Sequence, residues 1–68
     1  MKIYSAIKQI ALRKEISIYQ IEKDLSLSNG LVSTWDKHTP SIINLQKVAD
    51  YLDVTISSIM NKAKEDTK

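Results

Sequence analysis

Residues 26–37 read SLSNGLVSTWDK and hold the only glycine and the only tryptophan of a 68-residue chain. Ser28 stands where the N-cap of a helix is expected, because serine accepts a hydrogen bond from the first free backbone N–H groups. Val32 and Trp35 then follow at the spacing of one helical face. The stretch therefore predicts a helix from about Asn29 to Lys37.

Gly30 falls inside this expected helix, where glycine costs about 0.5–1 kcal/mol relative to alanine. If the helix is present, replacing Gly30 by alanine is neutral or stabilising for the fold. The glycine leaves two interpretations open. Either the stretch is not helical, or another molecule comes very close to its backbone.

A serine or threonine that follows an apolar residue recurs along the chain and predicts further helix starts. In the stretch ISIYQI, Ser17 and Gln20 form a capping box, and Ile16 and Ile21 form a hydrophobic staple around it. The alternation of this stretch also fits a β-strand, so a mixed α/β fold stays an alternative. The same spacing returns at Leu27-Ser28-Val32 and Val54-Thr55-Ile59, and more loosely at Pro40-Ser41-Leu45.

The spacing of apolar residues predicts an all-α fold, a compact five-helix domain over residues 1–64. Residues 65–68 form a charged tail that is expected to be disordered. The expected helices run from about Lys2 to Lys14, Ile18 to Leu25, Asn29 to Lys37, Ile42 to Leu52 and Ile56 to Lys64. Their expected core residues are Ile3, Ile7, Ile10, Ala11, Ile18, Ile21, Leu25, Val32, Trp35, Leu45, Val48, Ala49, Leu52, Ile59, Met60 and Ala63.

Composition excludes several classes of function. The chain has no cysteine, so disulfides, thiolate zinc sites and cysteine nucleophiles are absent, and a cytoplasmic location is expected. His38 has no second metal ligand at suitable spacing, and Glu22 and Asp24 form no convincing acid–base pair. We therefore expect no enzyme, metal, cofactor, small-molecule ligand or membrane span. The net charge of +2 is mildly basic.

The junction between the second and third expected helices is the most informative feature. A turn of about three residues, which ends at the cap Ser28, follows Leu25. Such a short turn makes two helices cross steeply, as in a helix-turn-helix. The outward face of the third helix is small, polar and nearly free of acidic residues. A contact with DNA explains this face and the close approach at Gly30, while a solvent-exposed face without a role remains the alternative.

Several stretches resemble the lambda-repressor-like family, the Cro and phage-repressor type of helix-turn-helix domain. They are the capped helix from Ser17 to Leu25, the turn LSLS at 25–28, the pair Val32 and Trp35 followed by Asp36, and TPSIINLQKVADYLDVTISSIM at 39–60. The resemblance implies five helices around one core. It also implies a transcriptional regulator that binds double-stranded operator DNA sequence-specifically, usually as a homodimer.

The resemblance assigns roles to three groups of residues. The expected base contacts are Asn29, Gly30, Ser33 and Thr34, and the expected phosphate contacts are Ser17, Ile18, Tyr19, Lys37, His38, Thr39 and Asn44. The expected dimer contacts are Ile43, Ile56 and Met60, because the family usually places such contacts near the last helix and these apolar residues have no obvious place in the core. Met60 therefore belongs to two competing predictions, since the helical spacing also counts it as core.

The chain also departs from the family pattern. Glu22 stands at a position that is usually small, and the sequence offers no explanation for it. Ser26 replaces the glycine of the turn and must take an unfavourable backbone angle if the turn is kept. Asp53 replaces the glycine before the last helix. The family's arginine partner for Asp36 is replaced by Ala11, so the usual buried ion pair is not expected.

An alternative function is a protein-interaction module on the same fold, such as an antirepressor, an antitoxin half or an adaptor. The modest charge favours it, as does Ile18 at a position where the family often has a glutamine that contacts DNA. The acid-free outer face of the third helix favours DNA binding more strongly.

Overall fold

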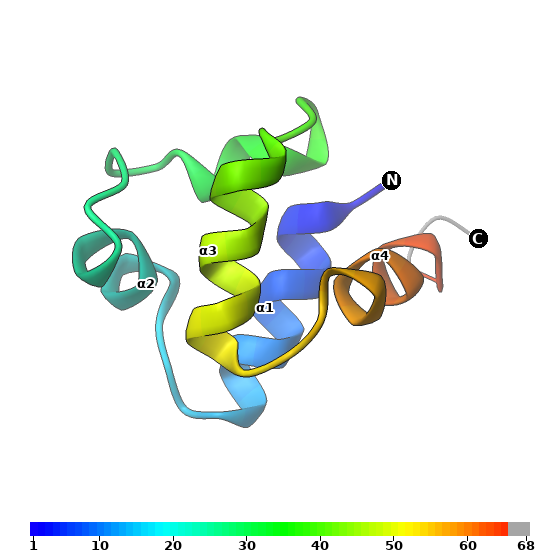
Figure 1. Ribbon diagram of the computed structural model, residues 1–68, viewed down its shortest axis with the longest axis horizontal. Helices are drawn as coiled ribbons and strands as arrows, with labels where there is room; N and C mark the ends of the chain where they lie inside the picture. The colour runs from blue at the N-terminus through cyan, green and yellow to red at the C-terminus, as the bar shows by residue number, and fades with distance from the viewer. Residues whose placement is uncertain (66–68) are drawn as a thin grey trace.

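The computed structural model describes residues 1–65, and this part of the chain is helical with no strand. It contains four α-helices and one 3-10 helix: α1 (Ile3–Arg13), α2 (Ile18–Asp24), η1 (Val32–Asp36), α3 (Ile42–Leu52) and α4 (Ile56–Glu65) (Figure 1). The all-α prediction is confirmed. Glu65 belongs to α4, and the rest of the expected tail, residues 66–68, lies outside the described residues.

The helices pack around one apolar core. α1 packs against both α4 and η1, and α3 also packs against α4. In Figure 1, α2 and α4 lie on opposite sides of α3. No helix within residues 1–65 is both long enough and apolar enough to cross a membrane.

Most of the expected core residues are buried, and each large apolar side chain that is fully buried contributes about 1.5–3 kcal/mol. Ile10, Ile18, Leu25 and Met60 are only half-buried and pack against the edge of the core. Ala63 of α4 is buried as expected, and the core also includes Ala6 of α1. These small residues let the two helices approach closely.

Three of the predicted helix starts are confirmed by their caps. The side-chain oxygen of the cap residue accepts a backbone N–H in each case, which satisfies one of the donors left free at a helix start. These bonds join Ser17 to Gln20 at 3.0 Å, Ser41 to Asn44 at 3.1 Å and Thr55 to Ser58 at 3.0 Å. The side-chain amide nitrogen of Gln20 donates to Asp24 (2.7 Å), and the reciprocal half of the capping box, a bond from the Ser17 N–H to Gln20, stays a prediction.

Helices α1, α2 and α3 end in the same way, although none of them ends on glycine. Each is followed by a residue with left-handed backbone angles: Glu15 (φ 58°), Ser26 (φ 57°) and Asp53 (φ 58°). The next residue is apolar, and its N–H bonds to the carbonyl five residues back, which is the Schellman ending. These bonds join Ile16 to Ala11 (2.9 Å), Leu27 to Glu22 (2.8 Å) and Val54 to Ala49 (2.9 Å). The expectation for Ser26 is confirmed.

The prediction of an α-helix from Asn29 to Lys37 is wrong. The N–H of Leu31 bonds to the carbonyl of Ser28 at 3.0 Å, which closes a four-residue turn before η1 begins. Gly30 is the third residue of this turn and has φ +88°, a value typical of a type II turn and rare for residues with a side chain.

Two further expectations depended on that helix and are also wrong. Ser28 does not cap η1, since η1 has no side-chain cap at its start. The expected gain from alanine at Gly30 is also wrong, because alanine is strained at this φ. The first of the two interpretations of Gly30 is therefore correct: the backbone there is not α-helical.

Candidate nucleic-acid interface

The carboxylate of Glu22 holds the turn before η1 from inside the molecule. Glu22 lies on α2 and is 3% exposed. One of its oxygens accepts the N–H of Gly30 and the other accepts the N–H of Val32, both at 3.0 Å. Hydrogen bonds to an ionised carboxylate are stronger than those between neutral groups. Glu22 therefore takes the capping role that the sequence assigned to Ser28.

Sequence reasoning left Glu22 unexplained, although the chain carries one signal. Ile18, Glu22 and Leu25 are spaced to share one face of α2, and that face is otherwise apolar. An acid on a buried face needs hydrogen-bond donors, and a following turn with a glycine supplies free N–H groups. This signal indicates that Glu22 has hydrogen-bond donors as partners, but it does not identify them.

Asp36, at the end of η1, is turned toward α1. Its two carboxylate oxygens accept the backbone N–H of Ser5 (3.1 Å) and the Ser5 hydroxyl (2.7 Å). Burial raises the pKa of Asp36, but the hydrogen bonds from Ser5, a backbone hydrogen bond from Tyr4 and the charge of Lys2 together outweigh this effect. The pKa of Asp36 therefore lies below its usual value. Asp36 thus serves the start of α1, which Lys2 leaves without a side-chain cap. Ala11 is buried and supplies no partner, in keeping with the sequence.

The four residues expected to contact bases lie together on the turn and η1. Asn29, Gly30, Ser33 and Thr34 are all exposed. The Ser33 hydroxyl donates to the carbonyl of Gly30, and the Thr34 hydroxyl donates to that of Leu31, each at 2.7 Å. Because each hydroxyl has a single hydrogen and donates it internally, it presents only acceptor lone pairs to an outside partner.

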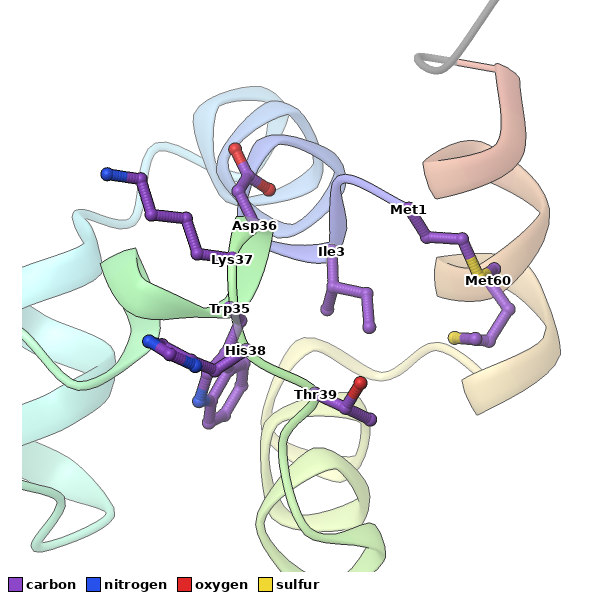
Figure 2. Close-up of a pocket in the computed structure, with 8 residues that line it drawn as sticks. All are labelled: Met1, Ile3, Trp35, Asp36, Lys37, His38, Thr39 and Met60. Carbon is purple, nitrogen blue, oxygen red and sulfur yellow. The ribbon is translucent and has the colours of Figure 1, made fainter.

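The cationic and polar residues after η1 are also exposed. Lys37, His38 and Thr39 follow Trp35, which is buried in the core as expected. They line one side of a surface pocket of about 180 Å³ together with Met1, Ile3, Trp35, Asp36 and Met60. In Figure 2 the Lys37 amine points away from the other lining side chains, and Lys37 is exposed.

The remaining expected phosphate contacts lie at the starts of α2 and α3. The Ser17 hydroxyl is engaged as the cap of α2, while Tyr19 is 61% exposed. The Ile18 side chain packs against the core, so only its backbone N–H can face an anion. Asn44 is half-buried in the first turn of α3.

The expected dimer contacts do not form one group. Ile43 is 68% exposed, next to Ile42 at 67%. Ile56 and Met60 instead pack against the core, so the premise that they have no place there is wrong. In Figure 2, Met60 lies beside Met1 in the pocket next to η1.

Among residues 1–65, no three His, Asp or Glu side chains gather closely enough to hold a metal ion. No protein-family model matches the chain, and no curated protein or solved structure is significantly similar to it. The case for a function therefore rests on the geometry of the turn and η1.

Proposed function

We propose that this chain is a helix-turn-helix transcriptional regulator of the lambda-repressor-like type that binds double-stranded DNA sequence-specifically. In this proposal α2 is the first helix of the motif. The turn at Asn29-Gly30 and η1 together form the element that enters the major groove. Residues 25–31 connect α2 to η1, a longer connection than the three residues expected from the sequence.

The strongest support for the proposal is that the carboxylates of both acidic residues next to this element are hydrogen-bonded within the protein. Glu22 is buried beneath the turn, and Asp36 is bonded to α1. The exposed residues from Ser28 to Thr34 therefore present no carboxylate, and Lys37 adds a cation at the far end. A phosphate backbone is repelled by free carboxylates and attracted by cations, so this surface suits DNA.

The chemistry of the exposed groups suggests which bases they read. The Asn29 amide both donates and accepts, which matches the N6 and N7 edge of adenine. The hydroxyls of Ser33 and Thr34 offer acceptors, which match the amino groups of adenine and cytosine. Because η1 is a single 3-10 segment of five residues, we expect direct readout of only a few base pairs per chain.

Selection of bound sequences from a random duplex pool tests the proposal, and we expect one short site to be enriched. On that site Asn29→Ala should lose about 1–3 kcal/mol of binding free energy and discriminate less at one base pair. Lys37→Ala should weaken binding to all duplexes equally and reduce the salt slope by about one.

Lys14→Ala is the matched control for Lys37→Ala, since it removes the same charge from an exposed lysine. Lys14 follows the C-terminal end of α1, whereas Ser5, near the other end, contacts η1. We expect Lys14→Ala to change the salt slope less than Lys37→Ala does. A selection that enriches no sequence, or binding that does not depend on salt, contradicts the proposal.

The exposed pair Ile42 and Ile43 supports a second element of the proposal, a homodimer that forms on DNA. A two-fold dimer would place the two reading elements about 34 Å apart, one turn of the double helix. Ile43→Gln should then lower affinity for a two-fold site and leave affinity for a half-site unchanged. Sedimentation that finds one chain on a two-fold site at saturation contradicts this element.

The same pair of isoleucines favours the alternative, a protein-interaction module without DNA binding of its own, because exposed apolar residues side by side often mark protein contacts. A titration with bulk duplex DNA at low salt separates the two functions. A DNA-binding protein shows an affinity that falls steeply as salt rises, and an adaptor shows no such affinity.

A further inference from the structure

Glu22 is the one buried charged residue in the described part of the chain, and both of its carboxylate oxygens are committed to the segment that carries the expected base contacts. We infer that Glu22 is a positioning residue that sets the base specificity of this protein without touching DNA. The inference rests on the proposed function, since it concerns the same surface.

The geometry explains why Glu22 controls this segment. Asn29 immediately precedes Gly30, the residue whose N–H bonds to one carboxylate oxygen, and Ser33 immediately follows Val32, whose N–H bonds to the other. The turn is otherwise closed by one backbone bond, from Leu31 to Ser28. Without the carboxylate, the backbone between Asn29 and Ser33 loses both of its hydrogen bonds to the Glu22 side chain of α2.

Base readout is more sensitive to this anchor than phosphate binding is. A bidentate contact to a base edge needs donor and acceptor within a few tenths of an ångström of their ideal places, because hydrogen bonds weaken steeply with distance and angle. Attraction between a flexible lysine and a phosphate tolerates such displacements. Loosening the turn should therefore lower the ratio of specific to non-specific affinity and spare bulk DNA binding.

The test compares Glu22→Gln with Asp24→Asn. Both variants remove one negative charge from α2, but Asp24 is exposed and bonds to Gln20 and Tyr51 rather than to the turn. Neither change should lower bulk DNA affinity. Only Glu22→Gln should lower the specificity ratio, by about tenfold, which is within the range that one base contact supplies.

A double-mutant cycle separates positioning from a general loss of structure. If Glu22 acts by placing Asn29, Glu22→Gln should reduce the specificity ratio much less in an Asn29→Ala background than in the parent. Equal reductions in both backgrounds overturn the inference, and so does an unchanged ratio in a folded Glu22→Gln protein. Trp35 fluorescence and circular dichroism establish that each variant is folded at the assay temperature.

A measurement on the parent protein keeps the inference testable if Glu22→Gln does not fold. The amide hydrogens of Gly30 and Val32 should exchange with solvent more slowly than the amide of Asn29, for which the structure gives no carboxylate partner. Equally fast exchange at all three positions overturns the inference. If the parent protein binds DNA without any sequence preference, the proposed function fails instead, whatever the exchange rates are.

Discussion

Gly30→Ala should destabilise this protein, and the structure allows the size of the effect to be worked out. Gly30 has φ +88°, a region in which an L-residue costs about 1–2 kcal/mol. A Cβ built at Gly30 meets no atom within 4 Å, so no clash adds to this cost. The whole effect is conformational, and we expect a loss of about 1–2 kcal/mol in the free energy of unfolding.

D-Alanine at the same position should act in the opposite direction. Its mirror-image backbone favours positive φ, and its methyl group restricts the unfolded chain as that of L-alanine does. Gly30 is exposed, so the D-methyl group lies at the surface. We expect the D-alanine protein, made by chemical synthesis, to be more stable than the parent by about 0.4–1 kcal/mol.

Thermal and urea unfolding followed by circular dichroism measure both changes. For a domain of this size each kcal/mol shifts the midpoint temperature by about 4–8 °C, so the L- and D-proteins should be clearly separated. An L-alanine protein as stable as the parent would refute the reasoning, since it would place Gly30 in a helical conformation. A D-alanine protein less stable than the L-form would refute it equally.

Three further predictions concern stability. Glu15→Gly should stabilise the fold by about 0.5–1 kcal/mol in urea unfolding, because glycine accepts the left-handed angles after α1, while Lys14→Gly, at negative φ, should destabilise it. Ser17→Ala should cost about 1 kcal/mol through the lost cap of α2, and Ser28→Ala should cost close to nothing, so equal losses would contradict the observed capping. Folding lowers the pKa of Asp36, so the contribution of Asp36 to the free energy of unfolding is complete above about pH 4, the unfolded pKa, and is lost as the pH falls through the lower folded value. Asp36→Asn should therefore make the free energy of unfolding depend less on pH in the acid range.

The helix boundaries that depend on local chemistry could be predicted from the sequence. Ser17, Ser41 and Thr55 each cap a helix through a bond to the residue three positions later, so the signal and its partner lie within one turn. Ser28 carries the same local signal, yet the carboxylate of Glu22 competes for the start of η1. That competition spans separate elements of the chain, and local patterns do not contain it.

The exposure of the candidate site residues could be predicted from the sequence, but the shape of their backbone could not. The outward face of the third expected helix predicts that its polar residues are exposed, and the structure exposes Asn29, Gly30, Ser33 and Thr34. The same argument put Gly30 on a regular helix, because the helical period continues through it and a positive φ leaves no trace in the spacing of apolar residues. The orientation of the Asp36 side chain toward α1 depends on tertiary packing alone.

The packing of α1 has a consequence for how the protein is made. α1 buries its apolar face against η1 and α4, and both are synthesised after it. At roughly 5–20 residues per second, a ribosome completes α4 some 3–10 s after α1, and the part of the face that α4 covers stays exposed for that interval. A product that stops before α4 keeps that apolar surface of α1 exposed, so it should be prone to aggregation and quickly degraded. Cells should therefore accumulate the complete domain and few shortened forms of it.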